Sequence, residues 1–116
     1  MIVDDYFIKV QVVKSSSIPW FELNINKLLL YKGSDFKVDY ILTYNSVNVT
    51  EYAGDISVLN ETETGSSRAT IDKENKKVVV SGLNEGNENF SLSTTFLGYT
   101  LSTKLNVVTS INENLL

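Results

Sequence analysis

The stretch Phe36-Lys37-Val38-Asp39-Tyr40-Ile41-Leu42-Thr43-Tyr44 alternates between two kinds of side chain. Every second residue from Phe36 to Tyr44 is apolar or aromatic, whereas Lys37, Asp39 and Thr43 mark the other face as polar. Successive side chains of a β-strand point to opposite faces, so this period of two predicts a strand with one buried and one wet face. It is the clearest local pattern in the chain.

Shorter alternating segments lie on both sides of this strand. Before it, Phe21–Ile25 and Leu28–Leu30 alternate with different parity, and the change at Asn26-Lys27 predicts a bulge or a switch between sheets. Polar turns separate the segments, including Lys32–Asp35 and Asp72–Lys76, where Asn75 is expected in a left-handed conformation. The strands expected after Tyr44 are Val47–Thr50, Asp55–Asn60, Ser67–Asp72, Lys77–Ser81, Phe90–Phe96 and Tyr99–Val107. About seven to eight short strands with turns between them predict a sandwich or a barrel.

Composition favours the same fold class. Asn, Ser and Thr make up 35 of the 116 residues, Val and Ile another 21, and Ala only two. Good helix formers are therefore scarce, whereas β-branched and turn-forming residues are abundant. The length suits one domain, for which we expect an N-terminal arm at residues 1–17, a β-body at 18–109 and a C-terminal tail at 110–116.

Three segments carry a resemblance to a known family. They are Leu30–Gly33 followed by Phe36–Val38, then Ala69–Val78, and finally Val80–Gly86 leading to Phe90–Leu92 and Asn106–Val108. Together they resemble a bacterial immunoglobulin-like domain of the group 2 type, as found in phage virion proteins and bacterial adhesins. The resemblance spans roughly three quarters of the chain and departs from the family pattern at Asn89-Phe90-Ser91-Leu92. It implies an all-β, Ig-like antiparallel β-sandwich with an extended N-terminal arm.

Such a sandwich without cysteine depends on its hydrophobic core. The alternation predicts that inward positions of both sheets fill this core, with large apolar side chains contributing most of the burial. The expected core residues are Phe36, Val38, Tyr40, Leu42, Ile56, Val58, Ile71, Val79, Phe90, Leu92, Phe96, Leu101 and Leu105. Val78, Val79 and Val80 are consecutive, which predicts a strand covered on both faces.

Several kinds of chemistry are not expected. The chain has no His and no Cys, which removes histidine base catalysis and most zinc, copper and haem sites. The pair Glu61 and Glu63, offered as glycosidase carboxylates, is more typical of an acidic turn. Calcium could be considered at Asp72–Asn75 or Asn84–Glu88, but neither loop has EF-hand spacing. We therefore expect a protein that is not an enzyme, with no cofactor and no metal.

Charge and hydropathy also restrict the partners. The net charge is −4 and the basic residues form no stripe, so a nucleic-acid partner is not expected. The longest apolar run is Leu28–Tyr31, which is too short to span a membrane. The N-terminus also lacks the cationic start and apolar stretch of a signal peptide. These features predict protein partners, with no nucleic acid and no membrane.

Two features predict partner contacts. The arm carries an apolar, alternating segment that would be unfavourable if left exposed to water. As a strand, this segment would pair either with a sheet edge of its own subunit or with a neighbouring subunit. Trp20 and Phe21 follow Pro19 and would either close one end of the sandwich or contact a protein or a sugar. The candidate partner-binding residues are Phe7, Ile8, Val10, Val12, Val13, Trp20 and Phe21.

The sequence thus predicts a binding or building module. Ig-like modules commonly act outside cells, and a chain without an export signal can reach the outside on a virus particle released by lysis. We expect a structural protein of a bacteriophage virion, a capsid decoration or a head–tail or tail accessory subunit, present in many copies and contacting capsid, portal or tail subunits. The alternative is a carbohydrate-binding or adhesion module that recognises a host surface glycan.

Overall fold

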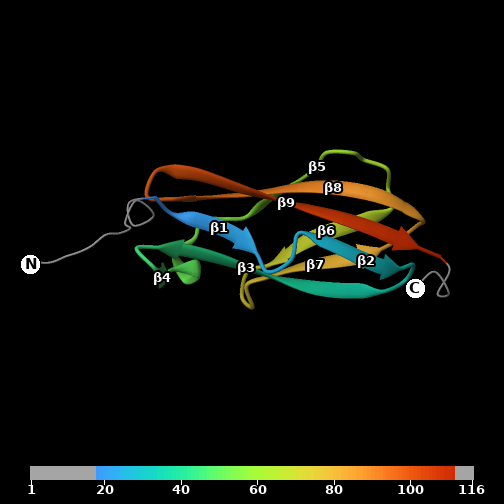
Figure 1. Ribbon diagram of the computed structural model, residues 1–116, viewed down its shortest axis with the longest axis horizontal. Coiled ribbons are helices and arrows are strands. Elements are labelled where there is room, and N and C mark those ends of the chain that lie inside the picture. The colour runs from blue at the N-terminus through green and yellow to red at the C-terminus, as the bar shows by residue number, and fades with distance from the viewer. Residues whose placement is uncertain (1–17, 112–116) are drawn as a thin grey trace, which may run out of the picture.

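A computed structural model describes residues 18–111 of the chain. The alternating stretch identified in the sequence forms β3 (Asp35–Tyr44), an inner strand of a five-stranded sheet with the order β1-β3-β7-β6, to which β4 is added beside β3. A four-stranded sheet with the order β2-β9-β8-β5 packs against it (Figure 1). The two sheets form the β-sandwich that the sequence predicts.

The strands have the following bounds. The first sheet contains β1 (Trp20–Leu23), β3, β4 (Val47–Asn48), β6 (Ser67–Asp72) and β7 (Lys77–Gly82). The second contains β2 (Lys27–Tyr31), β5 (Ser57–Asn60), β8 (Gly86–Phe96) and β9 (Tyr99–Ser110). The short 3-10 helix η2 (Thr50–Tyr52) follows β4 and begins at Thr50, the last residue of the predicted strand Val47–Thr50. In immunoglobulin lettering the sheets are ABED and CFG, with β2 added beside the last strand.

The parity change at Asn26-Lys27 is a switch between sheets, because β1 pairs with β3 and β2 pairs with β9. Two asparagines form hydrogen bonds where the chain passes from one sheet to the other. The backbone amide of Asn24 donates to the Asp39 carbonyl at 3.0 Å, and the Asn26 side chain donates to the Lys104 carbonyl at 2.8 Å. The chain crosses without reversing, so β2 runs parallel to β9, in contrast to the antiparallel pairing predicted throughout.

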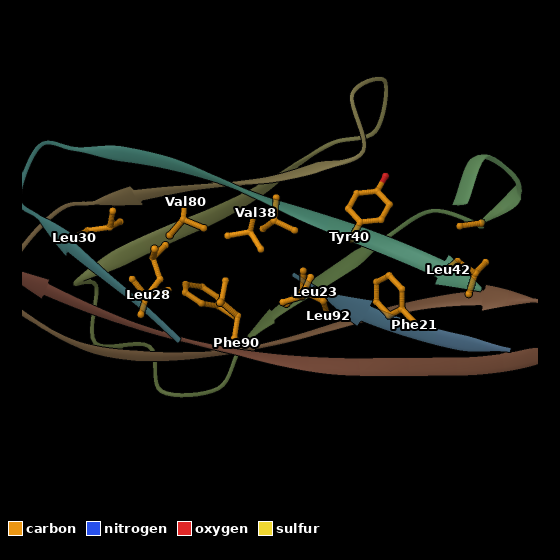
Figure 2. Close-up of a cluster of buried hydrophobic side chains, with 14 residues drawn as sticks. Phe21, Leu23, Leu28, Leu30, Val38, Tyr40, Leu42, Val80, Phe90 and Leu92 are labelled. Atoms are coloured by element: carbon orange, nitrogen blue, oxygen red, sulfur yellow. The ribbon is translucent and has the colours of Figure 1, made fainter. Parts of the chain in front are cut away.

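The core lies between the sheets and is drawn in Figure 2. Six of the predicted core residues are buried: Val38, Tyr40, Leu42, Phe90, Leu92 and Leu105. Five others are partly buried and pack against them: Ile56, Val58, Ile71, Phe96 and Leu101. Further core residues come from β1, β2, β7, β9 and the segment after η2: Phe21, Leu23, Leu28, Leu30, Ala53, Val78, Val80 and Val107.

Two of the core predictions are wrong. Phe36 shares a face with Val38 but lies at the beginning of β3, where 44% of its surface remains exposed. Val79 faces outward and is half-buried, whereas Val78 and Val80 have no exposed surface. The three valines therefore alternate in the ordinary way, because β7 has the opposite sheet on one face only.

The turns follow the predicted positions with two differences. Between β6 and β7 the left-handed residue is Lys76, with φ of 58°, and Asn75 instead uses its side-chain amide to donate to the Asp72 carboxylate at 2.8 Å. The connection predicted from Gly82 to Glu88 is shorter, since β8 already begins at Gly86. The β8–β9 hairpin turns through Leu97 and Gly98, both with positive φ, as a two-residue hairpin loop requires.

Within residues 18–111, the structure contains no helix that is both long enough and apolar enough to cross a membrane.

Candidate functional site

Trp20 and Ile18 form an exposed apolar surface at the beginning of β1. Trp20 is 63% exposed and Ile18 is 54% exposed, and the two side chains line the same shallow depression. Glu22, Thr43 and Ser46 complete its lining, and the indole N–H of Trp20 donates to the Glu22 carboxylate at 3.3 Å. An apolar centre with a polar margin is the composition of a protein contact surface. We call Ile18, Trp20, Glu22, Thr43 and Ser46 the Trp20 surface.

The two predicted aromatic contact residues on β1, Trp20 and Phe21, have different environments. Phe21 is buried between the sheets, and its ring meets that of Tyr40 edge to face with centroids 6.1 Å apart (Figure 2). With 6% of its surface exposed it belongs to the core, which corrects its prediction as a partner-binding residue. Trp20 is too exposed to close the end of the sandwich. The reason is the alternation of β1, which turns Phe21 inward and Trp20 outward.

The other predicted contact residues belong to the arm. Phe7, Ile8, Val10, Val12 and Val13 lie outside the described residues, so their prediction stays a prediction. The first described residues, Ile18 and Pro19, line a second depression together with Trp20 and Phe21 of β1 and Leu101 and Ser102 of β9. The arm therefore joins the body beside both the Trp20 surface and β9.

A second group of polar residues surrounds Glu88, which the sequence placed in a candidate calcium loop. Glu88 lies on β8 with no exposed surface, on the inward-facing side shared with Phe90 and Leu92. Three hydroxyls and three backbone amides lie within hydrogen-bond distance of its carboxylate, at 2.7–3.2 Å. These donors belong to Thr62, Thr64, Ser66 and Ser67.

These contacts determine the protonation state of Glu88. Burial by itself raises the pKa of a carboxyl, but the hydrogen bonds from Thr64, Thr62 and Ser67 stabilise the ionised form more strongly and lower the pKa of Glu88 to about 2. The carboxylate is therefore charged at neutral pH. It ties the connection between β5 and β6 to β8, which is a structural role.

The two loops considered for calcium gain no further acidic ligands from the fold within residues 18–111. Asp72 accepts hydrogen bonds from Asn75, which lower the pKa of its carboxyl, and Glu88 is surrounded by hydrogen-bond donors. In the part of the chain from Ile18 to Ile111, no three acidic side chains gather where they could hold a metal ion. The Glu61 carboxylate, considered for glycosidase chemistry, accepts from Lys104 Nζ at 2.7 Å.

The outer face of the second sheet is a feature that the sequence analysis missed. Outward positions of β8 and β9 lie opposite one another as Asn89 and Asn106, Ser91 and Lys104, Ser93 and Ser102, and Thr95 and Thr100. The Asn106 amide donates to both the Asn87 and Asn89 side chains, at 2.6 and 2.8 Å. Seven of these eight positions carry no charge. The polar residues at alternate positions of each strand could have predicted a polar outer face. Which of them lie opposite one another depends on the register of the two strands.

The sequence matches no protein-family model and no curated protein. The fold, however, resembles solved structures. Domains 4 and 5 of the S-layer protein SbsC have a TM-score of 0.56 and 15% identity, over 79% of this chain and 53% of that one. The SbsC structure of domains 4–9 has a TM-score of 0.62 and 14% identity, over 79% and 14%. The titin M3 domain has a TM-score of 0.50 and 5% identity, over 79% and 96%.

The chain therefore spans about half the length of the two-domain SbsC structure and a small part of the longer one. At these identities the likeness concerns the fold alone. Together with the two-sheet topology, it shows that this chain has an immunoglobulin-like β-sandwich fold.

Proposed function

We propose that this chain is a non-enzymatic structural module that joins other proteins in an assembly. In its more specific form, the proposal is a multi-copy subunit of a bacteriophage virion, built on the group 2 type of bacterial immunoglobulin-like domain and located on the particle. Its partners are other virion proteins, such as capsid, portal or tail subunits. The observation that carries the proposal is the exposed Trp20 and Ile18 at one end of a well-packed sandwich.

The energetics of the Trp20 surface support this proposal. Large aromatic side chains dominate binding energies at protein interfaces, and Trp is among the residues most enriched at such hot spots. Trp20 keeps 63% of its surface exposed although the same strand buries Phe21 and Leu23. Its removal would therefore leave the core unchanged, and a partner would gain the contact area that folding leaves unused.

The structural neighbours support the coarser form of the proposal. SbsC is an S-layer protein, and the part of it that resembles this chain belongs to structures of several of its domains. A module of the same fold with an exposed contact surface is suited to a repeated assembly. The SbsC neighbours thus support a structural role in an assembly, and the location on a virion is the more specific proposal.

Co-sedimentation tests the proposal. Particles collected from lysates of cells that encode the chain should contain it in fixed stoichiometry. Trp20→Ala should lower incorporation at least tenfold, because a central hot spot contributes about 2 kcal/mol or more. The matched control is Leu59→Ala, which removes a 61% exposed side chain from β5 at an edge strand of the other sheet. Normal incorporation of Trp20→Ala, or absence of the wild-type chain from particles, would contradict the proposal.

The carbohydrate-binding alternative has one observation in its favour. The uncharged amides and hydroxyls of the β8–β9 outer face, together with an exposed indole, are groups that can bind neutral sugars. A glycan array probed with the purified chain separates the two functions. Binding to a defined glycan that is lost in Trp20→Ala would favour the alternative over the assembly role.

A further inference from the structure

Strand β9 is paired along only part of one edge. Its other edge pairs with β8 from Tyr99 to Thr109, whereas β2 covers only Asn106 to Ser110. Among residues 18–111, no strand pairs with β9 on the β2 side before Asn106. The first half of this strand therefore presents an open sheet edge.

The backbone groups of this edge can be assigned from the register. Asn106 turns its amide toward β2, where it donates to the Asn26 carbonyl at 2.9 Å. Backbone groups alternate between the two edges of a strand, so Thr100, Ser102 and Lys104 turn theirs in the same direction. All three residues are exposed, and among the hydrogen bonds of residues 18–111 only one reaches this edge, from the Asn26 side chain to the Lys104 carbonyl. We call Thr100–Lys104 the acceptor edge.

We infer that Ile8–Val12 of the same chain adds to the acceptor edge as an antiparallel strand, with Lys9 opposite Ser102. Exposed edges of this kind accept extended segments, and native proteins usually cover them. The inference goes beyond the proposed function, because it concerns a contact within one subunit that forms whether or not an assembly exists.

The alternation of the arm matches both faces of the second sheet. In this register Val10 lies opposite Leu101 and Ile8 opposite Thr103, which are partly buried and face inward. Lys9 then lies on the polar outer face. A shift by two residues would place Lys9 opposite Lys104, and like charges in directly opposite positions are destabilising.

The attachment point favours the chain's own arm over that of a second copy. Ile18 and Pro19 line a depression together with Leu101 and Ser102, so the arm joins the body directly beside the acceptor edge. Residues 13–17 can span up to about 17 Å, which is enough for a loop that reverses direction. A short tether gives an effective concentration in the millimolar range, which exceeds that of free copies at micromolar protein.

Disulfide trapping in the full chain tests the inference. The chain has no cysteine, so Lys9→Cys with Ser102→Cys introduces the only possible pair. Directly opposite residues of an antiparallel pair have Cα atoms about 5.5 Å apart, within the range that a disulfide bridges. Val10→Cys with Ser102→Cys is the matched control, because its side chains lie on opposite faces of the added strand.

Three outcomes are distinguishable on a non-reducing gel. Oxidation of Lys9→Cys/Ser102→Cys to an intramolecular disulfide, with little closure of the control, supports the inference. A disulfide-linked dimer would overturn it, because the occupant would then be the arm of a second copy. Failure of both pairs to close would also overturn it.

Amide hydrogen exchange gives a second readout that needs no cross-link. The amides of Thr100 and Ser102 should be protected in the wild-type chain, and Ile8→Asp/Val10→Asp should lower their protection at least about tenfold. Lys9→Asp/Gln11→Asp changes the outward face of the same segment and should preserve the protection. Unprotected Thr100 and Ser102 amides in the wild-type chain would contradict the inference.

Discussion

Glu88 holds a negative charge inside the protein because the connection between β5 and β6 surrounds it with donors. The donors come from residues 21 to 26 positions earlier in the chain. The Asn60 side chain shapes this connection by accepting from the Glu63 amide at 2.8 Å. The result is a buried carboxylate whose lone pairs are satisfied without a cation, and that also joins two segments of the fold.

Glu88→Gln should destabilise the protein by about 2–3 kcal/mol, because the amide group cannot accept hydrogen bonds at both terminal atoms and leaves buried donors unsatisfied. Urea denaturation measures this difference as the change in the free energy of unfolding. Glu85→Gln is the matched control, since it makes the same change at an exposed position and should be close to neutral. Equal stability of the two variants would contradict the structural role of Glu88.

The stability contributed by Glu88 should depend on pH. The pKa of Glu88 is about 2 in the folded protein and about 4.5 when unperturbed, so between these values the unfolded chain binds more protons. The contribution is therefore fully present above pH 4.5 and is lost as the pH falls toward 2. The difference in unfolding free energy between wild type and Glu88→Gln should narrow across this range. A constant difference would mean that the pKa of Glu88 is not lowered.

At the scale of single elements, the β8–β9 hairpin carries a local strain. Its turn contains Leu97 with φ of 51° and Gly98 with φ of 82°, and a Leu rarely adopts a left-handed conformation. The turn is also exposed, with Leu97 at 62%. The hairpin therefore forms because of the pairing along β8 and β9, not because of the preference of Leu97.

Leu97→Asn should stabilise the protein by about 0.5 kcal/mol, because Asn tolerates the left-handed conformation and Asn-Gly is the preferred pair for such a turn. Thermal unfolding would show this as a rise in the melting temperature. Leu59→Asn serves as the control, since Leu59 is similarly exposed but lies in an extended strand, where Asn is unfavourable. A fall in stability for Leu97→Asn would contradict this account of the turn.

At the scale of the whole molecule, the two sheets approach closely at Gly82. A Cβ atom at this position would lie 2.8 Å from the carbonyl oxygen of Tyr31 on β2 and 3.1 Å from the Thr109 methyl group on β9. Gly82 is also held in place, since its amide donates to Ser34 and its carbonyl accepts from Gly33. The backbone of one sheet thus leaves no space for a side chain from the other.

Gly82→Ala should destabilise the protein by about 1–3 kcal/mol, since the added methyl group forces backbone shifts between the sheets. The free energy of unfolding in urea tests this expectation. The neighbouring Ser81→Ala, at an outward and half-buried position, should change stability by less than about 0.5 kcal/mol. Similar values for the two variants would show that the sheets can separate at this point without cost.

Most strands, most turns and the change of parity at Asn26-Lys27 follow from the sequence alone, because a period of two is a local property of neighbouring residues. The pairing of β1 with β3 and of β2 with β9 then decided that this change is a switch between sheets and not a bulge. Which predicted core positions are covered depends on the packing of the sheets, as Phe36 and Val79 show, and so does the exposure of Trp20. The inward position of Glu88 could be inferred from its alternation with Phe90 and Leu92, but its donors could not. Burial and hydrogen bonding depend on segments that are distant in sequence, and only the packing of the two sheets brings these segments together.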